Sequence, residues 1–276
     1  FFVNKELSQK RVLRATSLKG FVPKIISHTE NFYSYKFVDG ELLSTEISLY
    51  KYLDKFLQFC IKNFWKKQNL SQSKRKSFKD VCLNFYYYKT LDRVSDFYQI
   101  TDISDNSEII NDKKTTYLNS LLDKIDWDFI SNGIPTRFHG DFHFENILKC
   151  KNNKFMFIDW RQDFGGIIDY GDIYYDLAKL YHGIIVDHGA IRKNMFKINL
   201  NDSKKIVDYE IYRKQTSYKS EEILMSFLKK NKFSISKVKI LTALIFLNIA
   251  SLHHQPYSIF LYFLGKDMLN RTLNES

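Results

Sequence analysis

The sequence contains few residues that interrupt helices or cross-link a chain. Only 3 prolines and 10 glycines occur among 276 residues, and this scarcity favours long, mainly helical elements. The 3 cysteines lie far apart and lack the CxxC spacing of a zinc site. Such cysteines argue against a disulfide framework and favour a reducing, cytoplasmic location, with Cys60, Cys82 and Cys150 serving as small buried apolar residues.

Long hydrophobic runs are also lacking. The most apolar stretch, 240–252, contains Asn248 and is shorter than the roughly 20 residues that a helix needs to span a bilayer. We therefore expect no membrane insertion and interpret this stretch as a buried helix. The composition, 44% hydrophobic and 26% charged, provides enough apolar residues for a sizeable core.

The charge balance is basic, since 42 Lys and Arg residues stand against 31 Asp and Glu residues and give a formal net charge of +11. This excess has two interpretations: a nucleic-acid or membrane-surface partner, or lysines spread over solvated faces. The basic residues are scattered, and no run reaches the length of a basic tail. The sequence therefore favours the second interpretation, with no nucleic-acid partner. A basic surface would also suit a protein that handles anionic phosphates.

Apolar spacing predicts a short N-terminal segment with strands, followed by a larger helical segment with one hairpin. The hairpin signal is strong, because the apolar runs 147–150 and 155–158 are joined by polar residues. The other predicted elements are helices at 5–18, 42–65, 80–94, 117–125 and 174–181, strands at 24–26 and 32–38, a loop at 68–76, irregular chain at 159–171, and a helical tail at 220–273 that breaks near Gln255-Pro256 and Gly265.

Chemically informative residues surround the predicted hairpin. His139, Asp141 and Asn146 have the spacing H-x-D-x-x-x-x-N, and Asp159 follows the second hairpin strand. Because the first strand leaves Asn146 and the second returns to Asp159, an amide oxygen and a carboxylate should converge on one point. Oxygen ligands of this kind suit Mg²⁺ with phosphate oxygens completing its shell. Asp141, one loop away, is placed to accept a proton from an incoming hydroxyl.

These groups form the set that kinases use for phosphoryl transfer: an Asp base, an Asn metal ligand and a second Asp metal ligand. The catalytic candidates are Asp141 and His139, and the metal candidates are Asn146 and Asp159. The protein itself forms no covalent bond in such a reaction, because the rate enhancement comes from positioning the reactants and stabilising charge.

Four pieces of sequence resemble the aminoglycoside phosphotransferase and choline kinase family, in which an HGD…N motif precedes an ID[WF] motif and a GDPxYDLA stretch. They are His139-Gly140-Asp141, Asn146-Ile147-Leu148, Ile158-Asp159-Trp160 and Gly171-Asp172-Ile173-Tyr174-Tyr175-Asp176-Leu177-Ala178. The resemblance implies an α+β, two-lobed protein-kinase-like fold. A small, truncated antiparallel lobe at 1–38 would precede a mainly helical lobe at 39–276, with a catalytic loop at 137–148 and a metal-binding segment at 155–166.

The resemblance also implies ATP and Mg²⁺ as cofactors. Backbone groups of Tyr35, Lys36, Phe37 and Val38 would bind adenine, and Glu6 would be the helix glutamate that pairs with a phosphate-binding lysine. The sequence departs from the family here, because no strand with that lysine and no phosphate-covering loop precede the helix. We expect the missing strands to lie upstream of Phe1.

Several residues keep two interpretations. His139 can hold the loop instead of taking part in chemistry, and His139 with His143 has the spacing of a zinc pair. Asp172 is expected to hold the catalytic loop through backbone N–H groups, and Asp176 to cap a helix or pair with an arginine. Asp163 either joins the metal or substrate shell or is a plain loop carboxylate, and Arg161 is a candidate contact for phosphate or substrate. The aromatic residues form either a cation–π box or ordinary core; they are Trp160, Tyr170, Tyr174, Tyr175 and Tyr181.

The sequence thus predicts a small-molecule kinase that phosphorylates a hydroxyl. The acceptor stays open between a sugar, a choline-like amino alcohol and an aminoglycoside, with a weak likeness to phosphotransferases of capsule or lipooligosaccharide synthesis. The rival hypothesis is a catalytically impaired, pseudokinase-like binding domain of a longer polypeptide, which the missing lysine favours. The joint presence of Asp141, Asn146 and Asp159 favours the enzyme.

Overall fold

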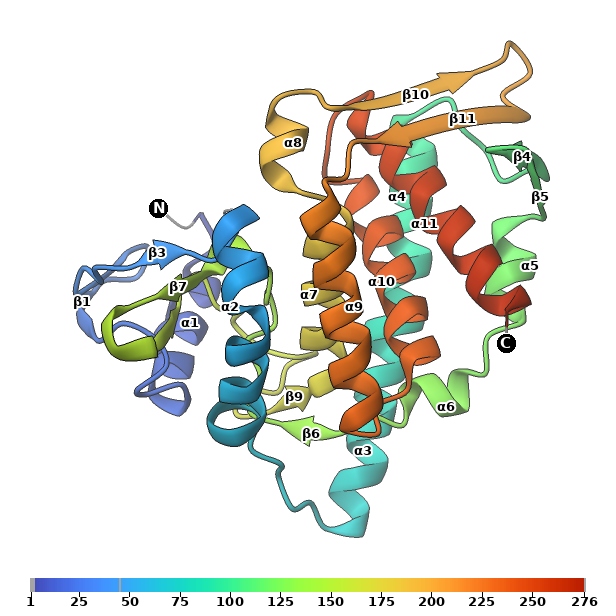
Figure 1. The fold of residues 1–276 in the computed structure, drawn as a ribbon. Helices are drawn as coiled ribbons and strands as arrows, with labels where there is room; N and C mark the ends of the chain where they lie inside the picture. The colour runs from blue at the N-terminus through green and yellow to red at the C-terminus, as the bar shows by residue number, and fades with distance from the viewer. Residues whose placement is uncertain (1–2, 45, 276) are drawn as a thin grey trace.

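The computed structural model describes residues 3–44 and 46–275, and shows a mixed α+β chain in which helices predominate (Figure 1). Residues 1, 2, 45 and 276, which belong to the predicted segments 1–38 and 39–276, lie outside the described residues. No helix in the described part of the chain is long and apolar enough to cross a membrane.

The N-terminal segment forms the predicted helix and strands. Helix α1 (Lys5–Ser17) is capped by Asn4, whose side chain accepts a hydrogen bond from the Leu7 amide at 3.2 Å. Strand β1 (Ile25–His28) pairs antiparallel with β2 (Tyr33–Tyr35).

The helical segment at 72–100 is longer than predicted. Helix α2 (Glu46–Phe59) continues as a π-helical turn, Cys60–Phe64, and α3 (Gln72–Leu83) passes through a second π-helical turn, Asn84–Tyr88, into α4 (Lys89–Ile100). The predicted loop at 68–76 is therefore wrong from Gln72 onward. The Ser71 hydroxyl accepts a hydrogen bond from the Lys74 amide and starts α3 on a polar turn that carries no apolar pattern.

The predicted hairpin is confirmed. Strand β7 (Ile147–Lys149) pairs antiparallel with β8 (Phe155–Phe157), and Ile147 lies opposite Phe157. A single 3₁₀ turn, Lys151–Asn153, connects them. Strand β3 (Glu41–Leu42) adds to the other edge of β7, so this small sheet joins the start of the helical segment to the predicted active-site region.

A four-stranded sheet was not predicted. Two of its strands have only three residues each, and one of these pairs parallel with a strand from a distant part of the chain, although residues 196–200 alternate apolar and polar side chains as a strand should. The sheet has the order β10-β11-β4-β5 and consists of β4 (Glu108–Ile110), β5 (Lys113–Thr115), β10 (Phe196–Leu200) and β11 (Ile206–Ile211). The remaining short elements are α5 (Leu118–Asp123), α6 (Trp127–Ser131), β6 (Pro135–Thr136) paired with β9 (Gly171–Asp172), a 3₁₀ turn (Phe144–Asn146) and α8 (His188–Arg192).

Four long helices complete the chain: α7 (Ile173–Ile185), α9 (Gln215–Lys230), α10 (Ile235–Ala250) and α11 (Tyr257–Asn274). The predicted break at Pro256 is confirmed, because α11 starts directly after it. The predicted break at Gly265 is wrong. A Cβ on Gly265 would lie 2.9 Å from the carbonyl oxygen of Ala243, so this glycine lets α11 approach α10 closely and does not end the helix.

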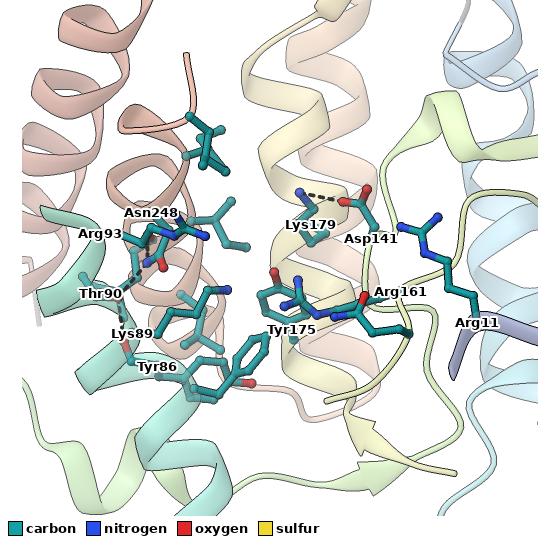
Figure 2. A pocket seen from close by; sticks show the side chains of 17 residues that line it. Arg11, Tyr86, Lys89, Thr90, Arg93, Asp141, Arg161, Tyr175, Lys179 and Asn248 are labelled. Carbon is teal, nitrogen blue, oxygen red and sulfur yellow. Dashed lines mark hydrogen bonds and ion pairs between the residues drawn. The ribbon is translucent and has the colours of Figure 1, made fainter. Parts of the chain in front are cut away.

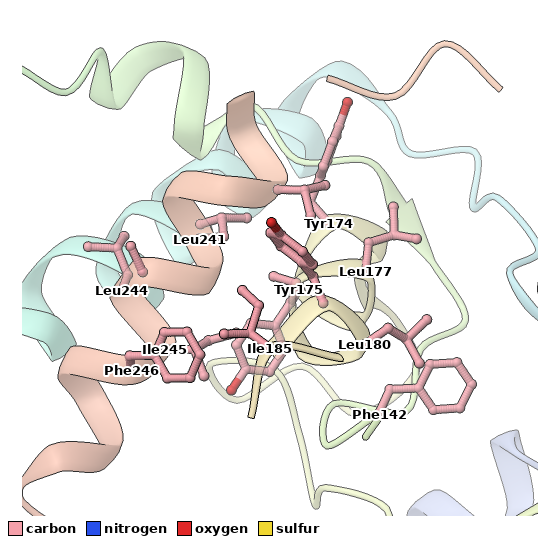
Figure 3. Packing of buried hydrophobic residues seen from close by; sticks show 14 of the residues in the cluster. Phe142, Tyr174, Tyr175, Leu177, Leu180, Ile185, Leu241, Leu244, Ile245 and Phe246 are labelled. Carbon is pink, nitrogen blue, oxygen red and sulfur yellow. The ribbon is translucent and has the colours of Figure 1, made fainter. Parts of the chain in front are cut away.

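The buried core runs beneath the hairpin and between the long helices. Leu180 of α7 lies on the side of Phe142, whereas Leu241 and Leu244 of α10 lie on the other side of α7 (Figure 3), so α7 is packed on both sides within one buried cluster. Beneath the hairpin, the rings of Phe142, Phe157 and Phe64 pack edge to face or tilted at centroid distances of 4.7–5.5 Å. The loop that carries Asp141 therefore sits directly on an aromatic core.

We expect Phe157→Ala to lower the free energy of unfolding by about 3–5 kcal/mol, because it leaves a cavity under the hairpin. Phe157 is fully buried, whereas Phe37 is 85% exposed and offers a matched control. Urea unfolding measures both variants, and Phe37→Ala should change stability by less than about 0.5 kcal/mol. Equal losses in the two variants would contradict the packing described above.

Candidate active site

The loop that precedes Asp141 is held by a buried carboxylate on α7. Asp176 accepts hydrogen bonds from the backbone amides of His139 and Gly140, both at 2.8 Å, and from the Trp65 indole at 3.0 Å. Asp172 lies one turn earlier and accepts from the amides of Ile134 and Tyr174, thereby capping α7. The expected roles are thus interchanged: Asp176 holds the loop and Asp172 caps the helix. The reason is their position: Asp176 lies within α7 and reaches the loop, whereas Asp172 precedes α7, in the short strand β9 that pairs with β6.

His139 lies beneath the loop, fully buried. Its Nδ1 accepts from the Asp141 amide at 3.2 Å, and its Nε2 is 3.0 Å from the carbonyl oxygen of Ile158. Burial lowers the pKa of His139 to about 3, so the ring is neutral. These bonds link the loop before Asp141 to the end of the hairpin.

Gly140 permits the tight turn above His139. Its φ is +87°, and a Cβ there would lie 2.7 Å from the Cβ of Arg161 and 2.8 Å from the ring of Phe138. A side chain at this position would push the segment after the hairpin away from the loop.

Asp141 is surrounded by donors. Lys179 Nζ lies 2.8 Å from its Oδ1, and His143 Nε2 lies 3.5 Å from its Oδ2. Although burial alone would raise the pKa of this carboxyl, Lys179 and His143 hold it well below the usual range. Asp141 is therefore ionised at neutral pH and can accept a hydrogen bond from a hydroxyl.

Asn146 joins Asp141 to the hairpin. Its side-chain nitrogen donates to the backbone carbonyl of Asp141 at 2.9 Å and lies 3.4 Å from Asp141 Oδ2. The backbone carbonyl of Asn146 accepts a hydrogen bond from the Ile158 amide. Asp159 follows Ile158 with a φ of 53°, a left-handed conformation that ends the second strand. The hydrogen bond between Asn146 and Ile158 therefore brings the backbone next to Asp159 beside Asn146, the other predicted metal ligand. No group of three His, Cys, Asp or Glu side chains among the described residues could hold a metal ion, which leaves no support for the zinc alternative at His139 and His143.

Two arginines of α1 contact this region, and neither was singled out from the sequence. Arg11 forms an ion pair with Asp159. Arg14 is buried and donates to the carbonyls of Phe138, His139, Arg161 and Ile168. Their spacing of three places both on one face of α1, but a helical face alone does not reveal its partner.

One of the predicted nucleotide-binding residues, Tyr35, lies near Asp159. The ring of Tyr35 is 6.4 Å from that of Trp160, which directly follows Asp159. The Lys36 amide donates to the Lys24 carbonyl, and Phe37 is largely exposed. Glu6 pairs with Lys10 on its own helix at 2.7 Å. The nucleotide-binding roles of residues 35–38 and Glu6 stay predictions.

A cavity of about 310 Å³ opens beside Asp141 (Figure 2). One wall is apolar and comes from α10, and Tyr175, Phe85 and Thr90 line other parts. Of the predicted aromatic cluster, Trp160, Tyr174, Tyr175 and Tyr181 are buried, as expected of core residues. The Lys, Arg and Asp side chains that line the cavity are Asp141, Arg11, Lys89, Arg93, Arg161 and Lys179.

Lys89 is the most perturbed cation of this cavity. Burial lowers its pKa to about 7, and the positive charges of Arg161, Arg93 and Lys179 add to the effect. Its ammonium lies 4.3 Å from the centroid of the Phe85 ring. A lysine in such surroundings costs stability, which is typical of functional sites.

We expect Lys89→Met to stabilise the protein, and more so in acid. Because folding lowers the pKa of Lys89 from 10.5 to about 7, the cost of its charge is fully present below pH 7 and fades as the pH rises toward 10.5. The gain in free energy of unfolding should be about 2–3 kcal/mol larger at pH 6 than at pH 9. Urea unfolding at both pH values measures it, with Lys74→Met at an exposed position of α3 as the control. A gain that does not change with pH would contradict the lowered pKa.

No protein-family profile and no curated protein sequence matches this chain. Among solved structures, a Plasmodium vivax ethanolamine kinase is similar over 98% of this chain and 73% of its own, with 14% sequence identity and a TM-score of 0.43. At this TM-score the likeness carries no argument about the fold or the activity, so the function is derived below from the residues of this chain.

Proposed function

We propose that this chain is an ATP- and Mg²⁺-dependent phosphotransferase that moves a γ-phosphoryl group onto a hydroxyl of a small molecule. The observation that carries the proposal is the ionised Asp141 carboxylate, held by Lys179 and Asn146 at the wall of a cavity large enough for a small acceptor. The cavity volume lies at the lower end of the range for small-molecule sites.

Asp141 supplies the proton acceptor for the reaction. The acceptor hydroxyl donates to a carboxylate oxygen of Asp141, and its proton passes there as the oxygen bonds to the γ-phosphorus. The bond between that phosphorus and the bridging oxygen of ADP breaks, and ADP leaves with the electron pair. Lys179, 2.8 Å from Asp141, places a positive charge beside the phosphoryl group in transit.

Asn146 and Asp159 are the residues that would hold Mg²⁺. Asp159 is a hard oxygen donor with a side chain that is 56% exposed, and the amide of Asn146 supplies a second oxygen one backbone hydrogen bond away. When bound, Mg²⁺ would neutralise negative charge on the phosphate oxygens. Arg11, which pairs with Asp159 in this structure, would have to move to a phosphate oxygen when Mg²⁺ binds the carboxylate.

The same Arg11–Asp159 ion pair favours a second candidate, a catalytically impaired binding domain. If Arg11 holds the carboxylate permanently, Mg²⁺ cannot bind there and nucleotide affinity would not depend on the metal. The two candidates therefore differ in their metal dependence.

Calorimetric titration with Mg-ATP separates them. We expect binding in the micromolar to sub-millimolar range that requires Mg²⁺ and is lost in Asp159→Asn, because that variant removes the charged metal ligand. Asp208→Asn, at an exposed position of β11, is the control and should bind as the original chain does. Metal-independent binding, or no binding by folded protein, would favour the binding domain.

Asp141→Asn should lower turnover by about 10²–10⁴-fold while Mg-ATP binding survives, because the amide cannot accept the hydroxyl proton. ADP release in the presence of the acceptor measures turnover, and calorimetry measures binding. Thermal unfolding checks that the fold persists, since the variant leaves the buried ammonium of Lys179 without its carboxylate. Unchanged turnover would remove Asp141 from its role.

A further inference from the structure

The charge of the cavity beside Asp141 is strongly unbalanced. Five of its lining residues are Lys or Arg, and Asp141 supplies the one carboxylate among the lining side chains that the structure describes. Lys179 is paired with Asp141, and Arg11 with Asp159. Arg93 pairs with Asp96, one helical turn away and outside the cavity lining, at 3.6 Å.

Lys89 and Arg161 differ from the other three cations. Within the described residues, neither forms an ion pair with a carboxylate at 4 Å or less, and the Nε of Arg161 is buried without a hydrogen-bond partner. Both point into the space between α4, α7 and α10 (Figure 2). Two neighbouring cations without a counter-charge are costly, and an anion bound between them would remove that cost.

A second polar group is also unsatisfied. The amide nitrogen of Asn248 donates to Thr90 and to the Leu244 carbonyl, both at 2.7 Å, and these bonds fix the orientation of the amide. Its Oδ1 is buried and accepts no hydrogen bond from any described residue, although Asn248 lines the cavity. A buried acceptor of this kind costs free energy unless a ligand hydroxyl donates to it.

We propose, resting on the phosphotransferase function above, that the acceptor is a polyhydroxylated anion, such as a sugar acid or a sugar phosphate. Its carboxylate or phosphate would bind between Lys89 and Arg161, and one of its hydroxyls would donate to Asn248. The hydroxyl to be phosphorylated would lie at Asp141, on the same cavity.

The same features disfavour the cationic acceptors that the sequence left open. A choline-like amino alcohol or an aminoglycoside would meet an excess of positive charge. The Phe85 ring is also not free for a quaternary ammonium, because Lys89 and Arg161 lie 4.3 and 5.0 Å from its centroid.

Calorimetry with matched compounds tests the proposal without ATP. D-gluconate and D-glucitol carry similar hydroxyls but differ in a carboxylate, glucose 6-phosphate and glucose differ in a phosphate, and choline is the cationic probe. We expect at least one anion to bind about tenfold or more tightly than its neutral match, and choline to bind no better than the neutral compounds. The stronger anion identifies the group that the cavity prefers. Equal binding of charged and neutral compounds, or preferred binding of choline, would overturn the anionic acceptor and leave the phosphotransferase standing.

Variants locate the site. Lys89→Met and Arg161→Gln should each weaken binding of the preferred anion by about tenfold, whereas Lys74→Met should leave it unchanged. Mg-ATP affinity should be retained in Lys89→Met, because Lys89 contacts the acceptor and not the nucleotide. A parallel loss of Mg-ATP affinity would assign these cations to the nucleotide phosphates and overturn the proposal. Anion binding by a chain that binds no Mg-ATP would overturn the acceptor role together with the phosphotransferase.

Discussion

The buried carboxylate of Asp176 determines the shape of the candidate active site. Two consecutive amides, of His139 and Gly140, donate to it, and these amides have no strand or helix partner of their own. Burial raises the pKa of Asp176 to about 6, so the ionised form is maintained by the donors that converge on it. Removing those donors would leave a buried charge uncompensated, and removing Asp176 would leave buried amides unpaired. The turn before Asp141 and the start of α7 are therefore held as one unit.

Helix α1 fixes the same loop from the other side. Arg14 donates to the carbonyls of Phe138 and His139, directly before Gly140, and to those of Arg161 and Ile168 in the segment after the hairpin. Its guanidinium lies 3.8 Å from the centroid of the Phe138 ring. Burial lowers the pKa of Arg14 to about 9, so it is still charged at neutral pH. Because Arg11 lies one turn earlier on this helix, anchoring Arg14 also delivers a guanidinium to Asp159. Helix α1 thus anchors the loop through Arg14 and places the positive charge of Arg11 beside Asp159.

The sequence revealed those parts of the site that are local. His139, Asp141, Asn146 and Asp159 are separated by one loop and one hairpin, and the hairpin formed as its apolar runs and polar turn predict. Contacts between distant segments were not predictable, since nothing in the sequence pairs Lys179 with Asp141 or brings Lys89 and Asn248 to one cavity. The roles of Asp172 and Asp176 were interchanged for a related reason: both are acidic residues of one helix start, and only the packing of α7 decides which faces the loop. Strand β11 pairs with β4 across about 100 residues, which the sequence could not reveal, whereas the apolar–polar alternation of β10 was a local signal that the prediction overlooked.

The two lysines that line the cavity differ in their effect on the stability of the fold. Lys179 is compensated by Asp141 and helps to hold it ionised, so this pair serves the fold and the site together. Lys89 has no such partner, and the lowering of its pKa to about 7 means that the folded chain resists its charge. The buried acceptor oxygen of Asn248 is a further cost within the same cavity. Unsatisfied groups of opposite hydrogen-bonding character, two cationic donors and one neutral acceptor, are best explained by a ligand that carries both an anionic group and hydroxyls, because such a ligand satisfies all three at once.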